Sequence, residues 1–111
     1  MQDTPPRPWL DLYRGVPATI EPSSETALAM FEAMLARGGD EPLVYYFDSS
    51  LSAAECDRMS DALAVALQQR GVETGDRIAV YMQNIPQVLL AVLAAWKCGA
   101  VVVPCNPMLR E

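Results

Sequence analysis

The 111-residue chain is long enough for one small domain or a part of a larger one, and a hydrophobic content of 51% argues against disorder over most of it. The formal net charge of −6, without histidine and without a lysine or arginine cluster, disfavours nucleic-acid binding and a polybasic membrane patch. Neither a run of about 18 apolar residues nor a basic, apolar signal peptide is present, so we expect no transmembrane segment and a cytoplasmic location.

Five prolines lie in residues 1–22 and exclude a continuous helix there. The apolar residues of this arm predict that it docks onto a surface, either of this chain or of sequence outside it; they are Trp9, Leu10, Leu12 and Tyr13. An amphipathic helix is expected next, capped by Ser23 or Ser24 and ended by Gly38 and Gly39.

A strand is expected over 43–47, followed by a tight turn over 48–50. Ser52 and Glu55 then form an S-x-x-E capping box, which begins a helix that runs to Arg70 and stops at Gly71. The expected inner face of that helix comprises Cys56, Met59, Leu63, Ala66 and Leu67.

The C-terminal third predicts a strand over 77–82, a helix over 86–98 that Asn84 caps, and a strand over 100–104. Together they form a parallel βαβ unit, 77–104, in an α/β fold. The unbroken run A-V-V-V-P predicts a last strand that is buried on both faces. Lys97 falls in the last helical turn, where a cation complements the helix dipole.

Few residues suggest chemistry. Asp57 and Asp61 are one helical turn apart, but with Arg58 beside them a solvated face is the better interpretation than a carboxylate pair. Packing is likewise preferred to thiol reactivity for Cys98 and Cys105, which have no evident base nearby in the sequence.

Neither G-x-G-x-x-G nor G-x-x-x-x-G-K-[ST] occurs, and the lack of histidine removes Ser-His and Cys-His pairs and most zinc sites. We therefore assign no catalytic residue, no cofactor-binding residue and no metal ligand to this chain.

Four motifs in order give a family resemblance. They are L-S-A-A-E-C at 51–56, G-D-R at 75–77, N-I-P at 84–86 and W-K-C-G-A-V-V-V-P at 96–104. They resemble the N-terminal region of the adenylate-forming (AMP-binding) enzymes, the acyl-CoA synthetase superfamily. The segments P-W-L-D-L-Y-R-G-V-P-A-T-I-E at 8–21 and N-P-M-L-R-E at 106–111 look most like its long-chain fatty acyl-CoA ligase branch.

The resemblance implies a Pro-rich arm, 1–22, and an incomplete N-terminal part of an AMP-binding domain, 23–111. The implied parent is a fatty acid–CoA ligase that forms an acyl-adenylate from ATP with Mg²⁺ and passes the acyl group to coenzyme A. In that family the phosphate loop, the nucleotide contacts and the catalytic lysine lie later in the chain. We expect no activity from these residues alone and a cytoplasmic enzyme, peripheral to the membrane in its full-length form.

Two positions depart from the family pattern. Ala53 stands where an aromatic residue is usual, and Cys56 where leucine is usual. Truncations of this kind cost roughly 2–5 kcal/mol each unless the space is refilled, and the expected outcome is either a smaller core contact or compensation by Met59.

Two other functions remain open. The chain could be a non-enzymatic module that pairs with itself or with a larger chain through an exposed sheet edge near Val101 to Val103. It could also be a small thiol protein that uses Cys98 and Cys105, an idea that rests on spacing alone.

Overall fold

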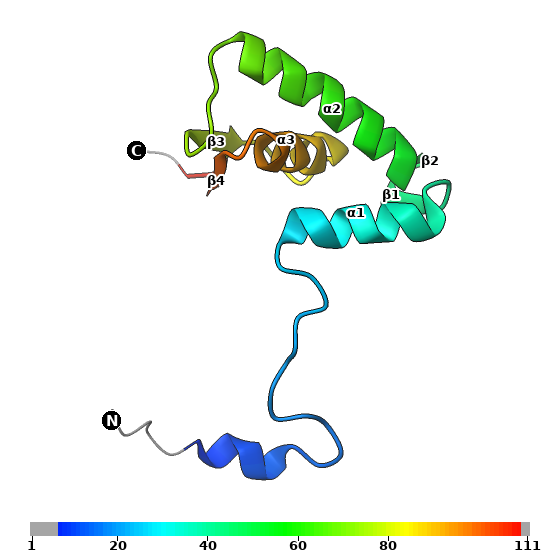
Figure 1. Cartoon of the computed structure of the whole chain (residues 1–111), viewed down its shortest axis with the longest axis vertical. Helices are drawn as coiled ribbons and strands as arrows, with labels where there is room; N and C mark the ends of the chain where they lie inside the picture. Colours follow the sequence, from blue (N-terminus) through cyan, green and yellow to red (C-terminus); the bar gives the residue numbers. More distant parts are fainter. Residues whose placement is uncertain (1–6, 110–111) are drawn as a thin grey trace.

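The computed structural model describes residues 7–109, in which a short arm leads into a mixed α/β body (Figure 1). The arm contains a 3₁₀ helix, η1 (Pro8–Leu12), and an extended segment. The body comprises α1 (Ala27–Gly38), β1 (Pro42–Tyr46), β2 (Ser49–Ser52), α2 (Ala53–Gln69), β3 (Arg77–Tyr81), α3 (Pro86–Lys97) and β4 (Val101–Cys105).

Two small sheets form within the described residues. Strands β1 and β2 pair as an antiparallel hairpin, and β3 and β4 pair in parallel from Arg77 opposite Val101 to Tyr81 opposite Cys105. The parallel βαβ unit expected over 77–104 is therefore confirmed. The α/β class is confirmed with it.

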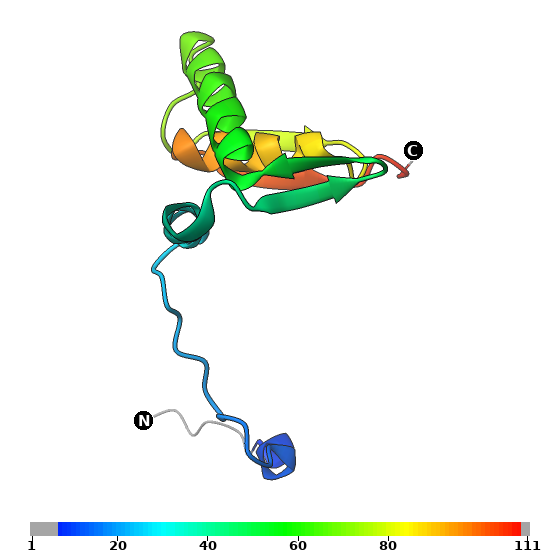
Figure 2. The ribbon, with the colours of Figure 1, turned by 90° about the vertical axis from the view of Figure 1, so that its right-hand side faces the viewer.

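Helix α3 is the central element, since it packs against α2, α1 and both strands of the parallel sheet. Figure 2 shows α2 on one side of this layer and α1 on the other. One hydrophobic cluster joins α2 to α3 and β4 through small side chains: Ala64, Ala94, Ala95, Cys98 and Ala100. A second joins α1, α2 and α3 through Phe31, Cys56, Leu90 and Leu93.

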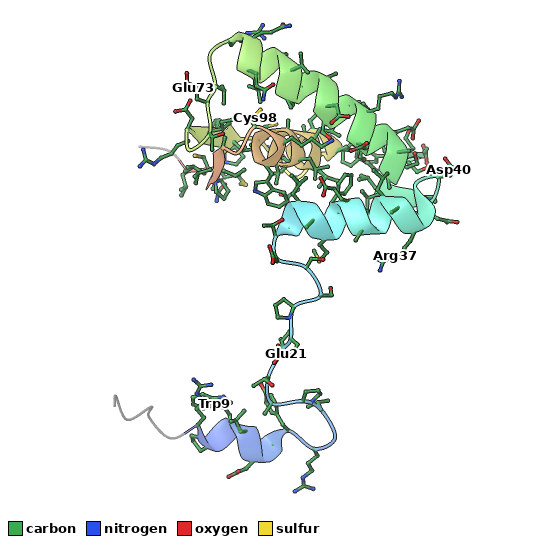
Figure 3. All side chains as sticks on the ribbon, viewed as in Figure 1. Trp9, Glu21, Arg37, Asp40, Glu73 and Cys98 are labelled. Atoms are coloured by element: carbon green, nitrogen blue, oxygen red, sulfur yellow. The ribbon has the colours of Figure 1, made fainter. Side chains whose placement is uncertain are left out.

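The arm lies away from the body in both ribbon views (Figures 1 and 2). Trp9 stands near its far end, whereas Cys98 lies in the body (Figure 3). Trp9, Leu12 and Tyr13 are all exposed, so the arm does not dock onto the described part of the chain. Docking onto sequence outside this chain stays a prediction, and the exclusion of a continuous helix over the arm is confirmed for residues 7–22.

Two helix starts differ from expectation. Thr26, rather than Ser23 or Ser24, caps α1 and accepts a 3.0 Å hydrogen bond from the amide of Ala29. A start at Ala27 already places Leu28 and Phe31 against the core, and an earlier start would add only polar residues, none of them buried.

Ile85, rather than Asn84, is the N-cap of α3, and it makes no side-chain capping bond. Pro86 at the first helical position has no amide hydrogen, so one of the free donors that a cap would satisfy does not exist.

The hairpin differs in part from the predicted strand and turn, whereas the predicted start of α2 is confirmed. The turn is Phe47–Asp48, and Ser49–Ser52, expected to begin as turn, is the strand β2. The capping box of Ser52 and Glu55 is confirmed, with both hydrogen bonds present at 3.1 and 2.8 Å.

Met59 is 41% exposed, so of the two alternatives at Cys56 the structure does not show compensation by Met59. Cys56 instead packs in a cluster with Phe31 and Leu93. Cys56, Leu63 and Leu67 of the expected inner face of α2 do face the core, and Ser60 and Ala64 are buried beside them because α3 lies on that side.

Strand β4 is not buried on both faces, contrary to the prediction. Val101 and Val103 are 51% and 38% exposed, whereas Val102 packs against the α2–α3 cluster. Helix α3 covers one face of the strand, and no other element among residues 7–109 covers the second.

Candidate functional site

The two glycine-containing motifs, at 75–77 and 96–104, meet at one corner of the βαβ unit. The amide of Gly75 donates to the carbonyl of Gly99 at 2.9 Å, and the amide of Val101 donates to the carbonyl of Asp76 at 2.7 Å. Gly99 has φ +70°, which glycine adopts at little cost. A Cβ atom there would lie 2.9 Å from Oγ1 of Thr74, so the corner requires glycine for both its conformation and its space.

Lys97 lies at the end of α3 and reaches across to α2. Its Nζ is 2.7 Å from Oδ1 of Asp57, 2.6 Å from Oδ1 of Asp61 and 3.1 Å from the carbonyl oxygen of Asp57. The ammonium also lies 6.0 Å from the centre of the Phe31 ring. One cation therefore bridges two carboxylates of the neighbouring helix, 36 and 40 residues away in the sequence.

The electrostatics of this cluster favour a charged lysine. Burial lowers the pKa of Lys97, but the hydrogen bonds and charges of Asp57 and Asp61 outweigh it and raise the pKa above its usual 10.5. The lysine is thus a poor general base at neutral pH. The space between the two carboxylates is already occupied by its ammonium, so the arrangement fixes α3 to α2 and does not form an open cation site.

The interpretation of Asp57 and Asp61 as a solvated face beside Arg58 was therefore incomplete. Lys97 does lie in the last turn of its helix, as expected, but its main partners are on α2. Nothing in the local sequence could have paired residues this far apart. Helix-face periodicity would have placed Asp57 and Asp61 together, but not opposite the lysine.

The three cysteines are separate free thiols. Cys56 is fully buried, and burial, followed by the charge of Glu55, raises the pKa of its thiol. Cys98 is buried with its Sγ 3.5 Å from the carbonyl oxygen of Ala64. Cys105 is the most accessible of the three and lines a groove between α3 and β4.

That groove has a volume of about 890 Å³. We call it the β4 groove. Its walls come from α3 and β4, chiefly Val88, Val92, Trp96, Val102 and Pro104. Side chains of this kind normally pack against another layer of secondary structure, and a contiguous exposed apolar surface marks a site of association.

The residues present do not fit a nucleotide or metal site. Across residues 7–109, no three acidic or cysteine side chains gather as a metal site would require. The groove walls are mainly apolar apart from Asn84 and Asn106, and they carry no lysine or arginine that could contact phosphate. We derive no chemical step of ATP, Mg²⁺ or coenzyme A from these residues.

The βαβ unit, the capped α2 helix and the glycine corner together define the N-terminal subdomain of an adenylate-forming enzyme. The family model of the AMP-binding enzyme matches residues 31–111. The chain belongs to the AMP-binding enzyme family, and it is most like the long-chain fatty acyl-CoA ligase branch.

Among similar proteins, the long-chain-fatty-acid–CoA ligase of Escherichia coli O6:H1 is 34% identical over 103 residues, which are 90% of this chain and 18% of that enzyme. The corresponding ligase of Bacillus subtilis is 30% identical and is matched over 95% of this chain and 19% of its own length. The chain thus spans about a fifth of the length of the curated relatives it matches.

Solved structures agree. The N-terminal subdomain of Klebsiella oxytoca NpsA, in complex with anthranilyl-AMSN, superposes with a TM-score of 0.73 at 27% identity, covering 77% of this chain and 22% of that one. A putative long-chain-fatty-acid CoA ligase from Rhodopseudomonas palustris gives 0.70 at 26% identity with the same coverage. Within the described residues, no helix is both long and apolar enough to span a bilayer.

Proposed function

We propose that the chain is the N-terminal segment of an ATP-dependent fatty acid–CoA ligase, and that it is inactive alone. The observation that supports the assignment is the order of its motifs. It agrees with the 34% identity to such a ligase over 90% of this chain. The role of the segment is structural: it supplies the central α3 helix and the two parallel strands on which further elements of the enzyme pack.

In this proposal residues 1–22 are an arm and 23–111 are the incomplete AMP-binding domain. ATP, Mg²⁺ and coenzyme A bind elsewhere in the enzyme, and this chain contributes no catalytic, cofactor-binding or metal-binding residue. The enzyme acts in the cytoplasm, at the periphery of the membrane.

The first test is the coding sequence that follows the codon for Glu111. A continuing frame that soon encodes a Ser/Thr/Gly-rich phosphate loop supports the proposal. The companion test is an assay of the purified chain with ATP, Mg²⁺, coenzyme A and a long-chain fatty acid. We expect no fatty-acid-dependent AMP, and AMP release by the chain alone would refute the inactivity.

The remainder of the ligase is the partner we propose for the β4 groove. A tagged chain is co-expressed with the Escherichia coli relative from which the matching N-terminal fifth has been deleted, and co-purification is measured. Val101→Lys should abolish association, because Val101 lines the β4 groove, is 51% exposed and would carry a charge into it. Val65→Lys on α2 is the matched control, since Val65 is also about half exposed but lies outside the groove.

A second candidate is a non-enzymatic module that self-associates through the edge at Val101 to Val103. The exposure of both valines favours it. Sedimentation of the purified chain separates the two: a concentration-dependent dimer that Val103→Lys dissociates supports the module, and a monomer at all concentrations contradicts it.

A further inference from the structure

Three consecutive aromatic residues occupy the end of the β1–β2 hairpin, and the strand residues Tyr45 and Tyr46 line a pocket that also includes Val88 and Val92 of α3. Phe47 is 89% exposed and Tyr45 is 76% exposed, while Tyr46 is partly covered. The rings of Tyr46 and Phe47 contact each other edge to face, with centroids 4.6 Å apart. We call Tyr45, Tyr46 and Phe47 the aromatic tip. Figure 2 shows the hairpin extending beyond α2 and α3.

The backbone at the aromatic tip is unfavourable for the residue it carries. Phe47 has φ +50°, and it is the one non-glycine residue with positive φ in the part of the chain that the structure describes. Two-residue hairpin turns of this kind favour asparagine or glycine, because a bulky side chain is strained in the left-handed region. A strained, exposed phenylalanine is not explained by folding, and such outliers concentrate where proteins bind ligands.

The geometry of the aromatic tip favours a fluid partner over a rigid one. Tyr45 and Tyr46 are neighbours in a strand, so their side chains point to opposite faces of the hairpin, and Phe47 lies at its end. A protein surface docked on one face would leave the other rings in water. The interface of a lipid bilayer surrounds a projecting tip on all sides, and tyrosine is enriched at that depth because its ring is apolar and its hydroxyl is polar.

The charges around the aromatic tip select the kind of lipid. Asp48 is the one charged residue between Pro42 and Ser52, and no lysine or arginine lies in this segment. A chain with a net charge of −6 is also repelled by an anionic surface. A small groove of about 270 Å³ beside the tip joins Tyr46 to the exposed Met82 and Met108, and Gln83, Asn84 and Asn106 line it as well.

We propose that Tyr45, Tyr46 and Phe47 insert into the interface of a lipid surface without net charge. The biological reason for such binding rests on the proposed function. Long-chain fatty acids partition into lipid surfaces, so a ligase bound there is close to its substrate. The binding itself requires no ligase activity.

The test measures partition of the complete chain onto phosphatidylcholine vesicles by co-sedimentation. We expect measurable binding, and a partition coefficient at least about 10-fold lower for Phe47→Gly, since the buried area of one phenylalanine ring is lost. The same substitution should leave the urea midpoint unchanged or higher, because glycine adopts φ +50° without strain. Tyr45→Ser, at a site of high exposure, is the second variant and should also weaken binding.

Val101→Ser is the control for non-specific binding through the β4 groove, and it should retain wild-type partition. An equal loss for Val101→Ser and Phe47→Gly would assign lipid binding to the groove and overturn the inference. So would an unchanged Phe47→Gly variant, a chain that does not sediment with vesicles at all, or stronger binding to phosphatidylglycerol. A chain that binds vesicles but belongs to no active ligase would refute the proposed function alone.

Discussion

Replacing Lys97 with methionine removes the cation that joins α3 to α2 while keeping most of the aliphatic side chain. Its Nζ contacts two carboxylates at 2.7 and 2.6 Å and one backbone carbonyl at 3.1 Å. The substitution leaves Asp57 and Asp61 facing each other without a counter-ion. We expect Lys97→Met to destabilise the fold.

The expected loss follows from the exposure of the three groups. The Lys97 side chain is 14% exposed, but Asp57 is 31% and Asp61 is 62% exposed, so water screens both pairs. Exposed pairs contribute roughly 0.2–1 kcal/mol each. With two pairs and a hydrogen bond to the Asp57 carbonyl, the free energy of unfolding should fall by about 1–2 kcal/mol. In a domain of this size the melting temperature should fall by about 5–15 °C.

Urea unfolding followed by circular dichroism measures this loss. An unchanged dependence of the unfolding free energy on urea concentration shows that only stability has changed. The double variant Asp57→Asn, Asp61→Asn is the matched background. In this double variant, Lys97→Met should lower the free energy of unfolding much less, because the carboxylates that bind the ammonium are gone. The effect in the wild-type background should also shrink at high salt.

An equal cost of Lys97→Met in both backgrounds would refute the reasoning. It would mean that the lysine stabilises the fold through packing of its methylene groups, or through the carbonyl of Asp57, and not through the two carboxylates.

Gly99→Ala should cost about 1–3 kcal/mol, more than Gly71→Ala, because both glycines have positive φ but only Gly99 faces a threonine side chain at 2.9 Å; equal losses in urea would contradict the steric contact. The pKa values of Cys56 and Lys97 are both raised in the folded state, so the contribution of these two groups to the free energy of unfolding should be fully present below pH 9.0 and decrease as the pH rises above it. A urea midpoint that stays constant above pH 9.0 would contradict this. With a thiol reagent, Cys105 should react first, Cys56 only on unfolding, and Cys105→Ser should remove the fast phase.

Interactions between groups that are close in the chain could be predicted from the sequence. The capping box of Ser52 and Glu55 spans one helical turn, and Gly71 and Gly99 end helices in the left-handed conformation that the sequence suggests. The βαβ unit was likewise predicted from the spacing of apolar residues. The family motifs consist largely of residues whose roles depend on near neighbours in the chain, such as helix caps and helix-ending glycines. For this reason the family could be recognised from the sequence.

The hairpin was predicted only in part. Ser49–Ser52 has little intrinsic strand preference, and it forms β2 because β1 lies beside it with its hydrogen-bonding groups in register. The aromatic tip was hidden for the same reason. Without the second strand, Tyr45 and Phe47 read as part of a strand, and neither the turn nor its positive φ could be inferred.

By itself, the sequence determined the α/β class, the capped helix α2, the parallel unit and the family, because these depend on local patterns and on motifs in order. Only the tertiary structure decided that Lys97 binds Asp57 and Asp61, that Met59 faces solvent, and that Val101 and Val103 remain exposed. These facts depend on how α2, α3 and β4 pack in three dimensions, and residues 36 or 40 positions apart carry no local signal of their contact.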